Sequence, residues 1–183
     1  MEFDDVVRKR RSLRSFASVD VSEAVLKDIA IVASLAPSCS NKQPWRFVFV
    51  RSPGMLERMF ATLTPGNAAW AKQASVIVAV WSRADLDCQT PDGRAYFQFD
   101  TGMASAFLML AATARGLETH PIAGFDPLAA REILALPSDA QVIALVIMGG
   151  RNQEISSALT DSQVKAETER PPRLPLEDFA RIV

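Results

Sequence analysis

Histidine, cysteine and tyrosine are scarce in this chain. Its 183 residues include one histidine, two cysteines and one tyrosine. Cys39 and Cys88 form no CxxC pair, and neither lies at a metal-site spacing from His120. The sequence therefore argues against a zinc centre, and against a histidine-dependent catalytic triad anywhere except around His120.

Long apolar runs are also missing. No stretch reaches the roughly 20 apolar residues that a membrane-spanning helix needs. The N-terminal text MEFDDVVRKRR begins with acidic residues and has no apolar run after its charges, unlike a secretory signal. We therefore expect a cytoplasmic protein in a reducing compartment. There Cys39 is a small residue of a tight loop, because no second cysteine lies near it in the sequence.

Positive charge is concentrated near the N-terminus. Residues 8–14 read RKRRSLR, although the formal net charge of the chain is -1. No basic stripe continues elsewhere, which disfavours nucleic acid, and acidic residues at 2, 4 and 5 disfavour a membrane surface. A solvated helix face and a phosphate pocket remain. Because arginine presents a fork of donors, Arg10, Arg11, Ser12 and Arg14 can converge on one phosphate.

The remaining pattern predicts one domain of the α+β class over residues 1–183. Ser22 is suited to cap a helix that Pro37 ends. Aromatic and β-branched runs predict strands, and apolar periodicity predicts further helices. The strands, each expected to be buried on both faces, lie at residues 45–50, 75–81 and 141–148; the helices lie at residues 53–63, 68–73, 96–115 and 127–136.

The helix expected at residues 96–115 is apolar nearly all round and rich in small residues, and Gly116 is suited to end it. Such a helix must be covered on every side, which in a domain of this size favours a subunit interface. The tail from about residue 151 is polar and rich in proline. We expect it to be disordered or to lie extended across another surface.

Four motifs now stand in order: RRSLRSF, APSCSNKQPW, FDTGMASAFLMLAATARGL and GLETHPIAGFD. Together they resemble the FMN-dependent nitroreductase family over residues 10–173. The resemblance implies a three-layer α/β/α sandwich with a mostly antiparallel central sheet. It also implies a homodimer with the long helix at its interface and the C-terminal tail on the partner subunit. Hydride would pass from NADH or NADPH to FMN, and then by a ping-pong mechanism to a nitroaromatic, a quinone or another electron-poor small molecule.

The family pattern assigns phosphate and ribityl contacts to Arg10, Ser12 and Arg14, with further contacts from Arg11. It also brings Arg173 back to the phosphate. A lysine that relatives often carry two residues before this arginine is Pro171 here, and Arg170 is a candidate replacement.

The same resemblance places Pro37, Ser38 and Asn41 against the flavin of the neighbouring subunit. Asn67 matches a residue at the isoalloxazine edge, with simple turn formation as the equal alternative. The backbone at Ala123 and Gly124 would pass close to the flavin N5. Some relatives carry an acidic residue where this chain has Ala123.

Several assignments stay open from the sequence. His120 is read first as a hydrogen-bonded structural residue. The short segment at residues 82–95 predicts an open acceptor site, with Tyr96 and Phe97 as candidate stacking residues. The alternatives to reductase activity are dehydrogenation, dehalogenation or flavin breakdown, as in other members of the family, and a flavin-binding protein without turnover.

Overall fold

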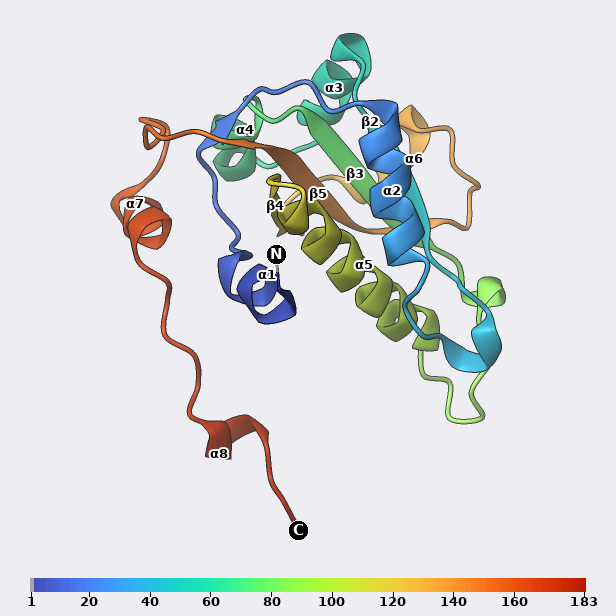
Figure 1. Cartoon of the computed structure of the whole chain (residues 1–183). Coiled ribbons are helices and arrows are strands. Elements are labelled where there is room, and N and C mark those ends of the chain that lie inside the picture. Colours follow the sequence, from blue (N-terminus) through green and yellow to red (C-terminus); the bar gives the residue numbers. More distant parts are fainter. Residues whose placement is uncertain (1) are drawn as a thin grey trace.

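The computed structural model describes residues 2–183 and consists of short helices around one sheet (Figure 1). The helices are α1 (Phe3–Lys9), α2 (Glu23–Ala33), α3 (Pro53–Phe60), α4 (Pro65–Ala71), α5 (Tyr96–Ala114), α6 (Pro127–Ile133), α7 (Asp161–Thr168) and α8 (Leu176–Phe179), with single turns η1 (Cys39–Asn41) and η2 (Ala84–Leu86). The strands are β1 (Phe16–Ala17), β2 (Arg46–Val50), β3 (Val76–Ser82), β4 (Glu118–Ile122) and β5 (Gln141–Arg151). Within residues 2–183, no helix combines the length and the apolar character needed to cross a membrane.

The sheet is antiparallel throughout, and β5 is its hub. β5 pairs with β1, β3 and β4, while β2 pairs with the other side of β3. β3 is buried along almost its whole length because it lies between β5 and β2. The predicted antiparallel sheet is therefore confirmed.

Successive residues of β3 face two different layers, as the two-residue period of a strand requires. Val76, Val78 and Val80 pack with buried residues of α2 and α5. Ile77 and Ala79 pack with residues of α3, α4 and α6. Helices therefore cover both faces of the sheet, and the three-layer α/β/α sandwich is confirmed.

The long helix α5 ends where the sequence predicts. Gly116 has a φ of 79°, a left-handed conformation that favours glycine. The N–H of Leu117 then donates to the Ala112 carbonyl, which closes the last turn. The expectation of burial on every side holds for only one face of the single chain. Phe99, Gly102 and Phe107 lie on the exposed face.

Strand β2 differs from the sequence expectation of burial on both faces. Its residues are mostly half-buried, and Arg46 is exposed. The reason is its position, since an edge strand has a neighbour on one side only. The sequence does not predict the short elements β1, β4 and α7, and it offers a helix at the basic run, near α1, only as one alternative.

Residues 152–169 fold back on their own chain. The Ser156 N–H donates to Ser15 Oγ at 3.1 Å, and α7 lies beside the segment that follows α1 (Figure 1). Beyond α7 the chain runs away from the body, and residues 170–183 are exposed. The extended part of the tail thus begins near residue 170 in this structure.

Candidate functional site

A cavity of about 240 Å³ lies where the segment after α1 meets the start of the tail. Arginines from both ends of the chain surround it, so the basic run and the C-terminal arginines predicted from the sequence are brought together. The lining residues, called the arginine pocket below, are Arg10, Arg11, Ser12, Arg14, His120, Ala166, Arg170, Pro171 and Arg173.

A larger hollow of about 880 Å³ lies along α3 and α4, away from the arginine pocket. Its charged lining residues carry both signs: Asp20, Arg51, Glu57 and Lys72. It offers no excess of one charge, so the arginine pocket is the better candidate for an anionic ligand.

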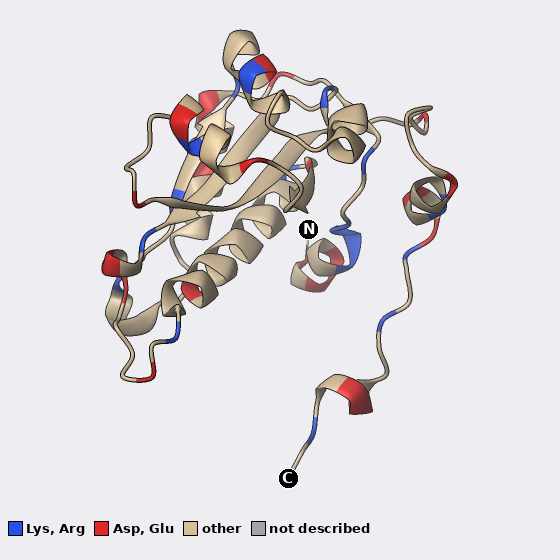
Figure 2. Cartoon of the chain, turned by 180° about the vertical axis from the view of Figure 1, so that it is seen from behind, with Lys and Arg blue, Asp and Glu red and all other residues tan. Residues whose placement is uncertain are grey.

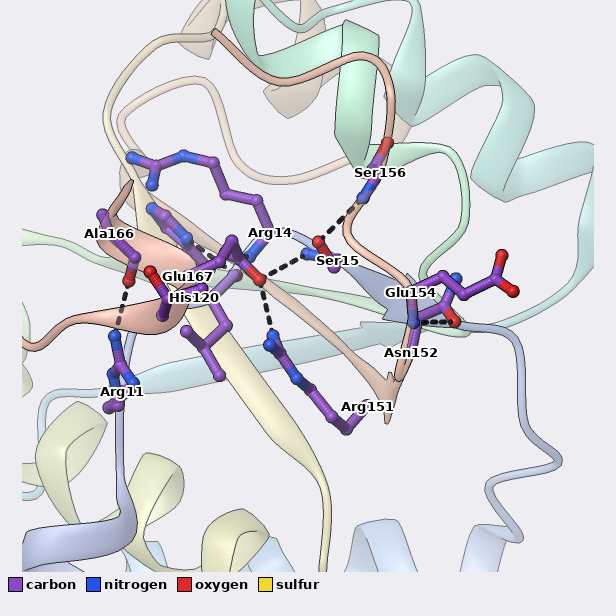
Figure 3. A network of polar contacts seen from close by, with 12 residues as sticks. Arg11, Arg14, Ser15, His120, Arg151, Asn152, Glu154, Ser156, Ala166 and Glu167 are labelled. Atoms are coloured by element: carbon purple, nitrogen blue, oxygen red, sulfur yellow. Dashed lines mark hydrogen bonds and ion pairs between the residues drawn. The ribbon is translucent and has the colours of Figure 1, made fainter. Parts of the chain in front are cut away.

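The backbone of the pocket is held by Glu167 of α7 (Figure 3). Its carboxylate accepts the N–H of Arg14 at 2.6 Å and the N–H of Ser15 at 3.3 Å. The same carboxylate pairs with Arg151 Nη1 at 2.5 Å. Glu167 is 3% exposed. The sequence does not point to Glu167, because it lies in the polar tail expected to be disordered or extended, 153 residues from Arg14.

Two of the arginines are occupied in building the pocket. Arg11 donates to the carbonyls of Ala166 and Glu169 at the end of α7, at 2.5 and 2.8 Å. Arg170 donates to the Arg8 carbonyl and, at 3.0 Å, to the Arg10 carbonyl. These contacts bind the tail to the basic run and give Arg11 and Arg170 structural roles.

Arg10 and Arg14 keep donors available for a ligand. Within residues 2–183 the Arg10 guanidinium makes one hydrogen bond, from Nη1 to Ser12 Oγ at 3.3 Å. The Arg14 guanidinium carbon lies 5.8 Å from the centre of the Trp70 ring, within the range of a cation–π contact. Arg14 Nε is buried and has no hydrogen-bond partner within residues 2–183. A buried donor of this kind is costly unless a ligand satisfies it.

The electrostatics agree with an anion site. Burial lowers the pKa of Arg10, and the nearby Arg170 and Arg173 lower it further. Burial also lowers the pKa of Arg14. Figure 2 shows Lys and Arg gathered at the end of α1, whereas both signs are interspersed over much of the remaining surface. The positive charge in the pocket is thus only partly compensated, and a phosphate would complete it.

His120 is a structural residue of the pocket floor, which agrees with the first reading of the sequence. It is 8% exposed, and its Nδ1 lies 3.0 Å from the Leu13 carbonyl. Its ring lies 4.8 Å from that of Trp70. Burial lowers the pKa of His120 to about 4, so the ring is neutral near pH 7 and Nδ1–H donates to Leu13. It adds no charge to the site.

Asn67 of α4 and Gly124, which follows β4, form a second contact point. The carbonyl of Gly124 accepts from Asn67 Nδ2 at 3.0 Å and from Thr64 Oγ1 at 3.1 Å. A Cβ on Gly124 would come within 2.6 Å of that Asn67 nitrogen, which explains the glycine. Ala123 beside it is exposed. In this chain the Asn67 amide therefore fixes the backbone at residues 123–125.

Pro37, Ser38 and Asn41 lie apart from the arginine pocket. Their turn contacts Asp100 near the start of α5, whereas His120 lies beyond the other end of that helix (Figure 1). Ser38 Oγ accepts the N–H of Gln43 at 2.9 Å. Ser40, Asn41 and Gln43 all have positive φ. Such left-handed residues store strain and cluster at functional sites. A single chain does not unite this turn with the pocket.

Two expectations near this turn are wrong. A disulfide joins Cys39 to Cys88 across 49 residues, so Cys39 is not merely a small loop residue. The sequence does not indicate this pairing, because the turn at η1 and the loop after η2 meet only in the fold.

The second wrong expectation concerns Phe97. Phe97 is 4% exposed and belongs to the core, so it is unavailable for stacking. Tyr96 lies outside that core, with its ring 5.4 Å from that of Phe99.

Comparisons with known proteins identify the family of this chain. The model of the Nitroreductase family matches residues 7–150. The chain is 31% identical over 171 residues to an NADH dehydrogenase of Thermus thermophilus, covering 77% of this chain and 82% of that protein. It is 29% identical over 168 residues to the 5,6-dimethylbenzimidazole synthase of Rhodobacter capsulatus, covering 79% and 81%. A solved oxidoreductase containing FMN matches at a TM-score of 0.84 and 32% identity, over 99% of this chain and 91% of that one. The chain belongs to the nitroreductase family of oxidoreductases.

Proposed function

We propose that this protein is an FMN-dependent oxidoreductase that uses NADH or NADPH to reduce an electron-poor small molecule such as a nitroaromatic or a quinone. Family membership supports the class of reaction. The similar solved structure that contains FMN supports the flavin, and the NADH dehydrogenase relative supports a nicotinamide donor. The arginine pocket supports the phosphate end of that flavin.

The observation that carries the proposal is the unpartnered Arg14 Nε in a pocket of excess positive charge. We assign the FMN phosphate to Arg10, Ser12 and Arg14, with Arg173 closing the pocket from the tail. A phosphate offers three acceptor oxygens and nearly two negative charges, which match these donors. Glu167 holds the Arg14 and Ser15 backbone in place without pointing its own charge at the ligand.

When bound, FMN supplies the hydride chemistry, and this chain supplies position and electrostatics. The bonds from Asn67 and Thr64 to the Gly124 carbonyl fix the backbone beside the ring end of the site. Ala123 contributes no acid there, and neutral His120 adds neither charge nor a proton donor near pH 7. The short loop at residues 82–95 leaves the acceptor side open. Donor and acceptor would therefore use one site in turn, which is ping-pong kinetics.

The active form in this proposal is a homodimer. The exposed face of α5 carries aromatic and small residues, and the tail beyond residue 170 exposes Leu174, Leu176 and Phe179. Large apolar side chains in an extended segment favour contact with another surface. A second copy would also bring its own turn at Pro37, Ser38 and Asn41 to the flavin bound in the first.

The test is an absorption spectrum of the purified protein, followed by anaerobic titration with NADH and NADPH and turnover with a quinone. We expect a bound flavin that either donor reduces and the acceptor reoxidises. A flavoprotein that shows no turnover would support the alternative of a flavin-binding protein. Loss of the flavin chromophore during turnover would instead favour flavin breakdown.

Arg14→Ala tests the phosphate assignment directly. Because a hydrogen bond to a charged group contributes about 1.5–3 kcal/mol, we expect FMN to bind about ten- to hundredfold more weakly. Binding of riboflavin, which lacks the phosphate, should change little. Lys9→Ala is the matched control, since Lys9 is exposed and lines no part of the pocket. Equal FMN affinity in Arg14→Ala and the parent protein would refute the assignment.

A further inference from the structure

The Cys39–Cys88 disulfide lies among acidic groups that a purely structural crosslink does not require. A carboxylate oxygen of Asp87 and both cysteine sulfurs lie within 4.8 Å of one another. Both cysteines are half-buried, so the disulfide lies near the surface and not in the core. Asp100 of α5 lies behind the disulfide and is 0% exposed, while Asp87 is 6% exposed.

The two carboxyl groups contact the disulfide in the same way. Asp100 Oδ2 accepts the N–H of Cys39 at 2.7 Å, and Asp87 Oδ1 accepts the N–H of Cys88 at 2.7 Å. In each carboxyl group the other oxygen, Oδ1 of Asp100 and Oδ2 of Asp87, is buried without a hydrogen-bond partner within residues 2–183. Each acid is thus fixed to one cysteine and leaves one oxygen unused.

No positive charge compensates this pair. Among the ion pairs of residues 2–183, none includes Asp87 or Asp100. Burial raises the pKa of Asp100, and the neighbouring Asp87 raises it further, against the effect of the Cys39 N–H. Burial and a like charge nearby both favour the protonated form of Asp100. Asp100 is therefore the member of the pair suited to give a proton to a cysteine sulfur.

We propose that Cys39 and Cys88 form a redox-active thiol–disulfide exchange site, with the Asp87–Asp100 pair as its proton donor and acceptor and an external dithiol as its reaction partner. The inference is independent of the proposed flavin chemistry. The external dithiol gives its electrons to this disulfide and not to a flavin. The disulfide joins the turn at residues 36–43 to the loop at residues 82–95.

The exchange moves two electrons from the external dithiol to the disulfide. A thiolate of the external dithiol attacks one cysteine sulfur, the S–S bond breaks, and its electron pair leaves on the other sulfur. That sulfur takes a proton from the carboxyl pair, through a bridging water where it is not in direct reach. The second external thiol passes its proton to the carboxyl pair and attacks the mixed disulfide, and the first cysteine leaves as a thiolate that takes this proton back. The proton that the first external thiol gave to solvent when it formed the thiolate then reprotonates the carboxyl pair. The dithiol ends as a disulfide, and its two electrons and two protons end on Cys39 and Cys88.

The experiment follows free thiols by alkylation and mass spectrometry while dithiothreitol reduces the folded, full-length protein. We expect reduction without unfolding, judged by an unchanged circular dichroism spectrum. Asp100→Asn keeps an acceptor for the Cys39 N–H but removes the acid. Since general acid catalysis typically contributes 10²–10⁴-fold, we expect this variant to react at least about tenfold more slowly. Asp85→Asn, an exposed acid of η2, is the matched control and should react at the parent rate.

A structural role and a proton-transfer role respond differently to added buffer acid. In Asp100→Asn, increasing the concentration of imidazole buffer at constant pH should restore the rate of reduction, because the buffer replaces the missing acid. The parent protein should show no such dependence. Asp87→Asn provides the same test if Asp100→Asn does not fold. The proposal is overturned if both variants react at the parent rate, or if the parent disulfide is reduced only in denaturant. The readout is free thiol, so a failure of flavin binding does not affect it.

Discussion

At the scale of single residues, Glu167 connects parts of the chain that are far apart in sequence. Its carboxylate accepts from the Arg14 and Ser15 backbone and pairs with Arg151 of β5. Burial acts to raise the pKa of Glu167, but the Arg14 N–H and Arg151 outweigh it and hold the pKa below its usual value. The basic run is therefore shaped by a buried acid that does not line the arginine pocket.

Replacing Glu167 by Gln should loosen the arginine pocket. The amide offers one acceptor where the carboxylate offered two, so at least one buried donor loses its partner. We expect a loss of about 1–3 kcal/mol in unfolding free energy, measured by urea denaturation, together with weaker FMN binding. Glu169→Gln is the matched control, because Glu169 is exposed and its pairing with Lys165 is at the surface.

The stabilisation from Glu167 is present above about pH 4.5 and is lost as the pH falls through its lowered pKa. Equal stability of the two variants would contradict this role.

His120 should make the protein less stable in mild acid. Its pKa is about 4 in the folded chain against 6.5 as the ordinary value, so the unfolded chain binds the proton first as the pH falls. Stability is therefore lost from about pH 6.5 downwards, by about 2 kcal/mol between pH 7 and pH 5. In His120→Gln this part of the loss should disappear, whatever the variant's stability at pH 7. Urea denaturation of both proteins at the two pH values measures it, and identical pH dependence would show that His120 is not the group responsible.

At the scale of elements, the end of β4 is attached to the start of α4 through the Gly124 carbonyl. Gly124→Ala places a methyl group 2.6 Å from Asn67 Nδ2 and 2.7 Å from Thr64 Oγ1, so at least one of the two bonds must break. We expect a loss of about 1–3 kcal/mol in stability and a shifted visible spectrum of bound flavin. Gly66→Ala is the control, because a Cβ there meets nothing within 4 Å. Thermal melting and the flavin spectrum measure the two effects. No difference between the variants would mean that this attachment does not position the site.

The elements that the sequence predicts are those with a local signal. Ser22 accepts the Val25 N–H at 3.3 Å and starts α2, and the buried runs become β3 and β5. β4 was missed because the sequence ETHPI has no apolar alternation; it is a strand because β5 pairs with it. α7 was missed because its only buried residue is an acid. The arginines proposed for the phosphate follow from residue type and the family resemblance, whereas Glu167 and the Cys39–Cys88 bond depend on contacts between distant segments.

At the scale of the whole molecule, the exposed face of α5 and the extended tail are surfaces without a cover. Figure 1 shows the tail leaving the body beyond the arginine pocket, and its residues 174–183 are exposed. The face of α5 combines Phe99 and Phe107 with Gly102, whose missing side chain permits close approach of another backbone. In the proposed homodimer, a second copy of the chain covers both surfaces.

Gly102→Leu separates the needs of the single chain from those of the dimer. A Cβ at Gly102 meets nothing within 4 Å, and leucine favours a helix by roughly 0.5–1 kcal/mol over glycine, so the single chain should not be harmed. Bulk at this position should nevertheless block a closely packed partner. We expect light scattering after size exclusion to give about twice the 20.0 kDa chain mass for the parent protein and a shift towards one chain mass for the variant.

Gly54→Leu, at another helical glycine with open space around it, should leave the dimer intact. A dimer that persists in both variants would place the interface away from this face of α5, and the turn at Pro37, Ser38 and Asn41 would then need another route to the flavin.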